Sequence, residues 1–163
     1  MSRLDSVIRR LETQRDCLDA AIGLIRSVGG PVLEIGLGNG RTYDHLRKRC
    51  NGREIFVFDR RIAAHPDCVP DAAHMLLGDF AETMPGAGAR IGAPAALANA
   101  DIGTGNAAAS RALGERLAGW LAPLMAPRGV IVADQPMAVS GWRALPLPPS
   151  VGEGRYFMYR VAG

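Results

Sequence analysis

VLEIGLGNG, at residues 32–40, is the stretch from which the fold of this chain can be predicted. Its first four residues form a short, mostly apolar run that indicates a buried strand. Three alternating glycines, Gly36, Gly38 and Gly40, follow this run, and they let the backbone turn tightly and approach a ligand closely. The segment 42–50 continues as a predicted helix, so a strand, a glycine loop and a helix N-terminus occur in the order that suits ligand binding.

Strands and helices alternate on both sides of this segment. Apolar residues at helical spacing from Leu4 to Val28 predict an amphipathic N-terminal helix, which ends at Gly29-Gly30-Pro31. The remaining predictions are strands at 54–59, 75–77, 95–101 and 130–134, a helix at 106–125, and two closing strands near 142–147 and 156–161. Apolar strands that alternate with helices are typical of a parallel α/β sheet covered on both faces, here with an antiparallel edge formed by the closing hairpin.

Length and composition limit the function classes. The chain has 163 residues, which suits one domain, and hydrophobic residues make up 48% of it, which suits a sizeable core. A net charge of +3 is too small to indicate nucleic-acid binding. The three cysteines are far apart and odd in number, so we expect reduced thiols and a cytoplasmic location. The charged N-terminus indicates neither a signal peptide nor a membrane span.

Acidic residues recur where the predicted strands end. Glu34 lies beside the glycine loop, and Asp59, Asp79, Asp101 and Asp134 close four further strands. In open α/β sheets, ligands bind at the carboxyl ends of the strands. Asp59 follows the glycine loop by about 20 residues, the spacing at which an acid accepts hydrogen bonds from the ribose of a nucleotide. The sequence therefore predicts a nucleotide-like ligand along this edge of the sheet.

These residues resemble the class I S-adenosylmethionine-dependent methyltransferases. Residues 32–40 look like the first motif of that family, an acid followed by three alternating glycines, and the resemblance runs from about Gly30 to Asp134. It implies a doubly wound, Rossmann-like sheet of seven strands, mostly parallel, with an antiparallel C-terminal hairpin strand. One domain over 1–163 then comprises an N-terminal helix at 1–29, a cofactor-binding core at 30–134 and C-terminal strands at 135–163.

The resemblance implies S-adenosyl-L-methionine as the cofactor and a role for each matched residue. The glycine loop would lie under the methionine part, and Glu34 would orient this loop or meet the cofactor's amino group through water. Asp59 would hold the ribose hydroxyls, Asp79 would bind the adenine amino group, and Phe80 would offer a backbone N–H or an apolar wall. The full set implied for the cofactor is Glu34, Gly36, Leu37, Gly38, Asn39, Gly40, Tyr43, Asp59, Arg60, Gly78, Asp79, Phe80 and Asp101.

The reaction that the resemblance implies is an SN2 methyl transfer to a small-molecule acceptor, which the sequence does not identify. Asp101 is the candidate catalytic base, because a hydroxyl or amine acceptor must lose a proton. The segment 99–105 lacks the Asn-Pro-Pro-Tyr motif of enzymes that methylate amino groups of bases or glutamine. The histidines share no metal-ligand spacing, so no metal is assigned. Asp101, Asp134 and Gln135 nonetheless resemble the magnesium ligands of catechol-type methyltransferases, and metal dependence stays open as a second hypothesis.

Two other function classes stay open at this point. A non-catalytic module that binds S-adenosylmethionine as a signal fits the strong cofactor motifs and the weak substrate motifs. A nicotinamide-dependent oxidoreductase shares the fold, but Arg41 replaces the third glycine of its Gly-x-Gly-x-x-Gly loop and Lys48 is the only lysine. Because the chain has little material for a lid, we also expect a homo-oligomer that completes the pocket. Three roles are open for the N-terminal helix: it closes the pocket mouth, it forms a dimer face, or it only packs on the sheet.

Overall fold

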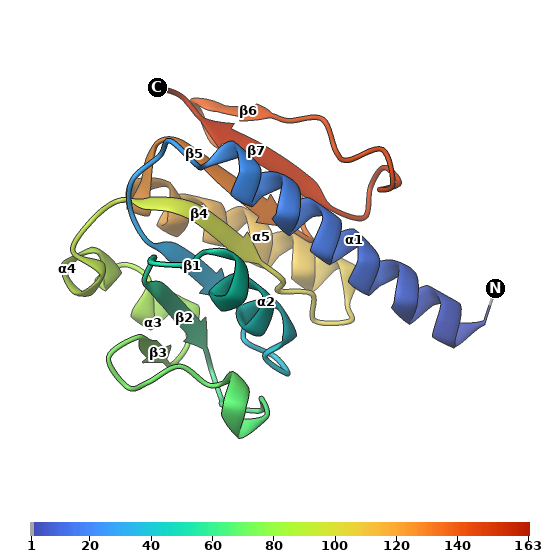
Figure 1. Cartoon of the computed structure of the whole chain (residues 1–163), viewed down its shortest axis with the longest axis horizontal. Coiled ribbons are helices and arrows are strands. Elements are labelled where there is room, and N and C mark those ends of the chain that lie inside the picture. Colours follow the sequence, from blue (N-terminus) through green and yellow to red (C-terminus); the bar gives the residue numbers. More distant parts are fainter. Residues whose placement is uncertain (1) are drawn as a thin grey trace.

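β1 (Val32–Ile35) lies inside a seven-stranded sheet in the computed structural model of the chain, which describes residues 2–163 (Figure 1). The other strands are β2 (Ile55–Asp59), β3 (Met75–Leu77), β4 (Ala95–Ala100), β5 (Met125–Ala133), β6 (Trp142–Ala144) and β7 (Phe157–Val161). They are ordered β3-β2-β1-β4-β5-β7-β6. β1 to β5 pair in parallel, whereas β7 runs antiparallel to both β5 and β6. The predicted mostly parallel sheet with an antiparallel C-terminal strand is therefore confirmed.

The order of the strands reverses between β1 and β4. The chain passes from β1 outward to β2 and β3, and then returns to β4 on the other side of β1. At the carboxyl end, Ile35 of β1 is paired with Phe58 of β2 and with Ala100 of β4. A reversal of this kind leaves a crevice outside the strand ends, where open α/β sheets bind their ligands. The loops that follow β1 and β4 therefore define the region of interest.

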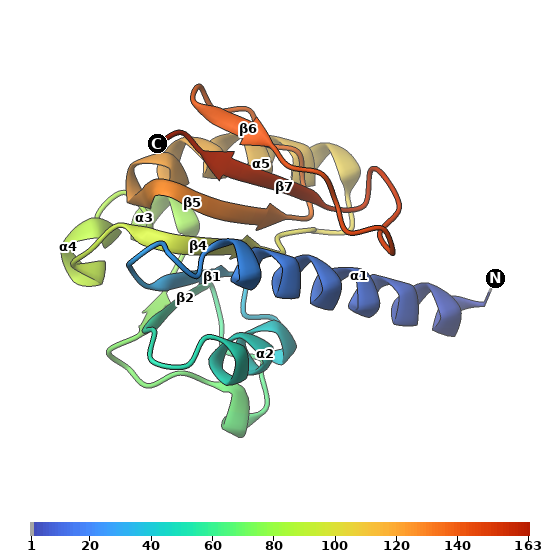
Figure 2. The ribbon, with the colours of Figure 1, turned by 45° about the horizontal axis from the view of Figure 1, so that its top comes forward.

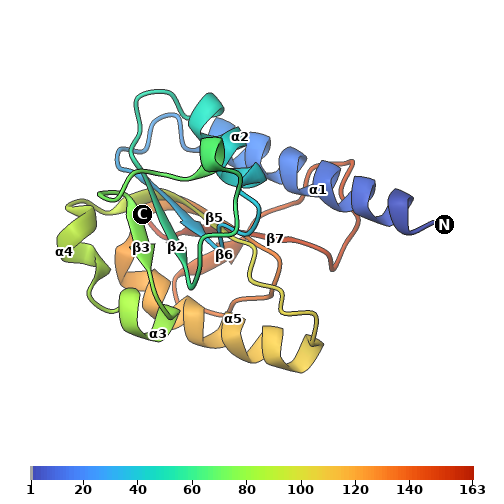
Figure 3. The ribbon, with the colours of Figure 1, turned by 90° about the horizontal axis from the view of Figure 1, so that it is seen from below.

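Helices cover both faces of the sheet. α1 (Arg3–Leu24) and α2 (Arg41–Arg49) pack on one face, while α3 (Phe80–Thr83), α4 (Ala87–Ile91) and α5 (Ala107–Leu121) pack on the other (Figure 3). Two short 3-10 helices, η1 (Pro66–Cys68) and η2 (Ala122–Leu124), are also present. The first turns of α1 extend past the sheet (Figure 2). Across residues 2–163, no helix combines the length and the apolar character needed to cross a membrane.

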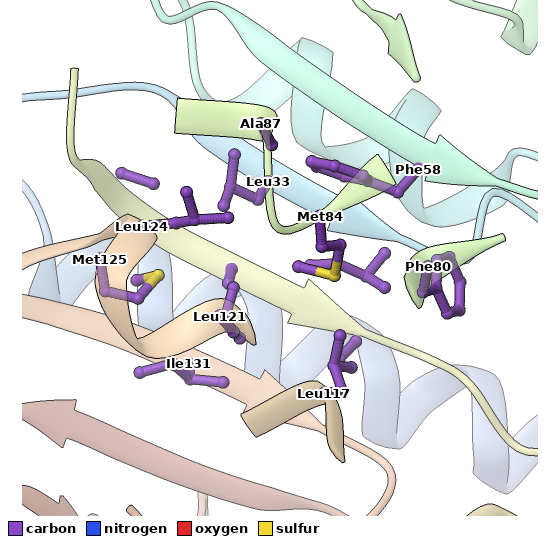
Figure 4. Packing of buried hydrophobic residues seen from close by; sticks show 14 of the residues in the cluster. Leu33, Phe58, Phe80, Met84, Ala87, Leu117, Leu121, Leu124, Met125 and Ile131 are labelled. Atoms are coloured by element: carbon purple, nitrogen blue, oxygen red, sulfur yellow. The ribbon is translucent and has the colours of Figure 1, made fainter. Parts of the chain in front are cut away.

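Alternate residues of the strands enter two separate cores. On the α5 face, Leu33 of β1 joins Phe58, Met84 and Leu121 in a buried cluster (Figure 4). On the opposite face, strand residues pack against Cys17, Leu18 and Ala21 of α1 and against Ile25 directly after it, and all four side chains are buried. Burying one large aliphatic or aromatic side chain contributes about 1.5–3 kcal/mol, so α1 is an integral part of the fold.

Several elements differ from the sequence predictions. α1 ends at Leu24, before Val28, and the Arg53 guanidinium binds the carbonyl oxygens of Ile25, Val28 and Gly30 in the non-helical segment that follows. β5 begins at Met125 instead of Val130, because the predicted turn at 127–129 is an irregularity within the strand. The short helices α3 and α4 were not predicted, since one turn shows no periodicity.

Candidate functional site

The glycine loop, residues 36–40, leaves the carboxyl end of β1 in a conformation that other residues rarely adopt. Gly36, Gly38 and Gly40 have φ angles of 93°, 52° and 83°. A Cβ added to Gly36 would come within 2.4 Å of the Asp101 carbonyl oxygen. Only glycine therefore lets the loop pass so close to the end of β4, and the loop exposes its backbone to the crevice.

Glu34 lies fully buried beneath this loop. Its Oε1 accepts a hydrogen bond from the Thr42 hydroxyl in the first turn of α2, and its Oε2 accepts one from Asn99 Nδ2 of β4 at 2.9 Å. Burial raises the pKa of Glu34 to about 8, although both hydrogen bonds oppose this shift. Both oxygens thus face protein groups, and this geometry ties β1, β4 and the start of α2 together.

Asp59 ends β2 directly beside the glycine loop. Its Oδ2 accepts the Gly38 N–H at 3.0 Å, and its Oδ1 accepts the Arg61 N–H at 3.2 Å. The neighbouring Arg60 is exposed. The carboxylate therefore lies at the rim of the crevice, at the position predicted for a ribose-binding acid.

The segment after β3 is placed at the next position along the same edge. The Gly78 N–H donates to the Asp59 carbonyl oxygen at 2.9 Å, so the ends of β2 and β3 are adjacent. Asp79 Oδ1 accepts the Ala81 N–H at 2.9 Å and caps α3. The Phe80 ring is buried in the core on the α5 face (Figure 4), which assigns the ring to packing.

Two adjoining pockets lie at the crevice. We call the first the loop pocket: it has a volume of about 220 Å³ and is lined by Gly36 to Asn39, Arg41 and Thr42, and by Arg10, Leu11 and Gln14 of α1. The second, the acid pocket, has a volume of about 280 Å³ and is lined by Thr13, Gly105, Asp134, Arg155 and Tyr156. Arg10, Asp101 and Gly103 line both pockets. Asp101 thus lies at the boundary between them.

Asp101 and Asp134 are brought together at the ends of β4 and β5. Gln14 Nε2 donates to Asp101 Oδ2 at 2.5 Å, and Arg10 Nη1 lies 3.7 Å from the same oxygen. Asp134 accepts the N–H groups of Ile102 and Gly103 at 3.1 and 2.8 Å, which fixes the loop after β4. Burial, followed by the negative charge of Asp134, raises the pKa of Asp101. A carboxylate with a raised pKa is better suited to accept a proton.

The proposed metal ligands are only partly brought together. The side chain of Gln135 lies against α5, since a Cβ added to Gly114 would come within 2.9 Å of the Gln135 Cβ. Both oxygens of Asp134 are bound to backbone N–H groups. Within the part of the chain that the structure describes, no three His, Cys, Asp or Glu side chains are grouped so that they could hold a metal ion.

Tyr43 lies outside the loop pocket. The Arg47 guanidinium lies 5.8 Å from the centroid of its ring, and both residues line a separate surface hollow with Asp71 and His74. Of the other predicted cofactor residues, Leu37 is buried in the core and also lines the loop pocket, while Asn39 Oδ1 accepts the Arg41 N–H at 3.3 Å.

The sequence predicts the N-terminal helix at the pocket mouth as one alternative, but it does not identify the individual residues of this helix, or Tyr156, as site residues. Arg10, Thr13 and Gln14 of α1 cover the crevice, and Tyr156 enters the acid pocket from the C-terminal segment. One signal was present in the sequence: the apolar stripe of the N-terminal helix is interrupted between Leu11 and Leu18. Thr13 and Gln14, which lie in this gap, are both buried.

Comparisons with known proteins cover nearly the whole chain. Residues 1–161 match the sequence model of a family described as S-adenosyl-L-methionine methyltransferase. The crystal structure of an S-adenosyl-L-methionine methyl transferase from Silicibacter pomeroyi DSS-3 is 44% identical, covers 99% of each chain and superposes with a TM-score of 0.93. No curated protein matches the chain significantly.

Two more distant structures share the fold alone. The O-methyltransferase TomG from Streptomyces achromogenes, involved in tomaymycin synthesis and solved in complex with S-adenosylmethionine, is 14% identical with a TM-score of 0.56, and the match covers 100% of this chain and 82% of TomG. DesVI from Streptomyces venezuelae is 15% identical with a TM-score of 0.55, over 90% of this chain and 65% of DesVI.

Proposed function

The chain belongs to the S-adenosyl-L-methionine methyltransferase family, and from this premise we propose that it transfers the methyl group to a small acceptor bound beside Asp101. Membership in the family makes the chain a transferase that uses S-adenosyl-L-methionine, so the nicotinamide-dependent and non-catalytic alternatives are not retained. One observation carries the proposal: the loop pocket and the acid pocket meet at Asp101. We propose that the methionine part of the cofactor occupies the first pocket and the acceptor the second, within a single domain over 1–163.

The residues around the loop pocket fit the cofactor. Gly36 and Gly38, both with positive φ, bring the backbone to the pocket wall, where it can lie under the methionine part, while Gly40 packs against Ala64 and Cys68. Asp59 supplies a carboxylate at the rim for the ribose hydroxyls, and Asp79 lies next along the edge for the adenine amino group. Glu34 acts through Thr42 as a positioning residue for the loop and α2. The sulfonium of the bound cofactor supplies an electrophilic methyl group.

Asp101 has the position of a general base. The acceptor heteroatom forms its bond to the methyl carbon as the C–S bond breaks, the electron pair stays on sulfur, and the acceptor's proton passes to Asp101. Since the leaving group is already excellent, alignment of the nucleophile contributes most of the rate, and the base adds a further factor. The raised pKa of Asp101 suits this role.

Calorimetric titration tests the proposed cofactor directly. We expect S-adenosylmethionine and its demethylated product S-adenosylhomocysteine to bind with one site per chain, and reduced nicotinamide dinucleotide not to bind. The physical reason is that the glycine loop accommodates the methionine part, whereas Arg41 stands where a dinucleotide loop needs glycine. Absence of heat from both sulfur compounds would sink the proposal.

Asp101→Asn is expected to lower the methyl-transfer rate by about tenfold to a hundredfold. General bases typically contribute about a hundredfold or more, and a smaller effect is expected here because alignment contributes most of the rate. The amide keeps the size of the side chain but cannot take the acceptor's proton. Transfer of labelled methyl groups to the small-molecule fraction of a cell extract measures the rate. Glu115→Gln, an exposed acid on α5, serves as the matched control and should have no effect. An unchanged rate in Asp101→Asn would remove the base from the mechanism.

The expected homo-oligomer remains part of this proposal. α1 of the same chain already lines both pockets, so a partner subunit is not needed to cover that side. The first turns of α1 nevertheless expose Leu4 by 67% and Val7 and Ile8 by 44% each, where the helix extends past the sheet (Figure 1). Exposed apolar side chains gathered on one protruding helix favour an interface between two copies.

Ile8→Glu is expected to convert the oligomer to a monomer, because a charge placed in an apolar contact must be desolvated. Multi-angle light scattering measures the mass, and Arg9→Glu, the adjacent exposed residue, controls for charge alone. The same mass for Ile8→Glu and the unmodified protein would exclude this face. Removing the whole helix is not a suitable test, since Cys17, Leu18 and Ala21 belong to the core.

A cytoplasmic location is also proposed. The three cysteines are free, and Cys17 and Cys50 are buried as thiols. Free thiols in place of disulfides are typical of proteins that work in a reducing compartment.

A further inference from the structure

The two carboxylates of the acid pocket already have partners within the chain. Asp134 accepts two backbone N–H groups of the loop after β4. Asp101 accepts from Gln14 and lies 3.7 Å from the Arg10 guanidinium. Neither carboxylate is therefore free to recruit a cationic ligand, and besides Asp101, which is the base in the proposed function, two other groups face a ligand.

Tyr156 is the first of these groups. The residue is only 3% exposed and lines the acid pocket, yet its hydroxyl has no hydrogen-bond partner among residues 2–163. Gln14, which donates to Asp101, lies beside this hydroxyl without completing a hydrogen bond to it. Burial and the nearby Asp101 charge raise the pKa of Tyr156, so the phenol stays neutral and keeps its proton to donate. A buried hydroxyl without a partner is costly and calls for an explanation.

Arg155 is the second. It lines the acid pocket, is exposed, and makes no ion pair within the described part of the chain. Arg10 lies on the other side, half-exposed on α1. An exposed guanidinium with free donors binds carboxylate groups through paired hydrogen bonds. The exposed side of the pocket therefore carries two arginines, while its interior holds the two carboxylates, which already have partners, and a neutral hydroxyl donor.

We propose that the acid pocket binds a small acceptor that carries a carboxylate: Arg155, helped by Arg10, holds the carboxylate at the mouth, and the nucleophilic hydroxyl or amine of the acceptor reaches Tyr156 and Asp101. This inference rests on the proposed function and adds the chemical class of the acceptor. The volume of about 280 Å³ leaves room for on the order of ten non-hydrogen atoms, taking about 30 Å³ for a water-sized group. Tyr156 would donate to the nucleophile and orient its lone pair, and Asp101 would take its proton.

The test uses the full-length protein saturated with S-adenosylhomocysteine. The probes are hydroxy- and aminocarboxylates of four to twelve non-hydrogen atoms, including 4-hydroxybenzoate, and each acid is paired with its primary amide, a compound of the same shape that lacks only the carboxylate charge. Calorimetry measures the affinity of each member. We expect at least one acid to bind tenfold or more tightly than its amide. If no acid binds more tightly than its amide, the inference is overturned.

Two variants assign the preference to the named side chains. Arg155→Gln should remove the preference for acid over amide, whereas Arg111→Gln, an exposed arginine on α5, should leave it unchanged. Tyr156→Phe should weaken the binding of both the acid and its amide at least tenfold. The melting temperature should stay the same or rise, because the hydroxyl has no partner in the unliganded protein. Unchanged binding in Tyr156→Phe would show that the hydroxyl does not face the acceptor.

The same samples separate the two proposals. Binding of S-adenosylhomocysteine is measured first in every protein, and it reports on the loop pocket alone. If the product does not bind, the proposed function fails. If it binds and the acids show no preference, only the carboxylate inference fails.

Discussion

Asp59→Ala is expected to weaken S-adenosyl-L-methionine binding by at least about a hundredfold and to leave the fold intact. The Asp59 carboxylate lies against the glycine loop, where Oδ2 accepts the Gly38 N–H at 3.0 Å. Hydrogen bonds to a charged group contribute roughly 1.5–3 kcal/mol each. In the proposed role this carboxylate holds two ribose hydroxyls, so its loss is expected to remove on the order of 3 kcal/mol, or about a hundredfold in Kd. Calorimetric titration measures the change.

Two further variants show whether the carboxylate itself is responsible. Asp59→Asn keeps the size of the side chain and one acceptor oxygen, so we expect an intermediate loss of about tenfold. Asp67→Ala removes an exposed acid on η1, outside the loop pocket, and should leave the Kd for the cofactor unchanged. Should Asp59→Ala bind the cofactor as tightly as Asp67→Ala does, Asp59 would have only the structural role of holding Gly38.

The sheet was predictable because its central strands are buried on both faces. Val32–Ile35 and Met75–Leu77 have the same bounds in the sequence and in the structure, since short apolar runs between glycine, proline and charged residues leave few alternatives. The end of α1 was not predictable in the same way. The Arg53 side chain, distant in sequence, binds the carbonyl groups at that end, and no local pattern contains this information.

The site was predictable only where one segment carries the signal. The glycine loop and Asp59 follow from a spacing within the chain, and the structure places them side by side. Gln14 and Asp101 are 87 positions apart, and Tyr156 comes from a third segment, so the acid pocket forms only when the fold brings three distant parts together. Gln135 shows the converse: it adjoins Asp134 in sequence, yet its side chain faces α5.

Glu34→Ala is expected to destabilise the protein by roughly 3–5 kcal/mol. The change removes the acceptor for the Thr42 hydroxyl and for the Asn99 amide, and it leaves a cavity between β1, β4 and α2. Each buried polar group left without a partner costs about 1–3 kcal/mol. Urea denaturation measures the free energy of unfolding. Glu34→Gln keeps the shape of the side chain and can hydrogen-bond both partners if the Asn99 amide turns over. Its loss of unfolding free energy should therefore be less than about half of that in Glu34→Ala.

The difference in unfolding free energy between the unmodified protein and Glu34→Gln, measured as a function of pH, shows whether burial or the hydrogen bonds determine the pKa of Glu34. Because the pKa of Glu34 is about 8 in the folded protein and 4.5 ordinarily, the folded state keeps a proton that the unfolded state releases between these values. The unfolded state then binds fewer protons, so the stability of the unmodified protein falls as pH rises, by up to about 1.4 kcal/mol per pH unit. Glu34→Gln lacks this group, whereas Asp101 titrates in both proteins and cancels in the difference. From pH 5.5 to 7.5 the unmodified protein should therefore lose stability relative to Glu34→Gln, and above the folded pKa the difference should level off. Parallel stability curves across this range would mean that Glu34 is ionised in the folded protein, and the two hydrogen bonds would then outweigh its burial.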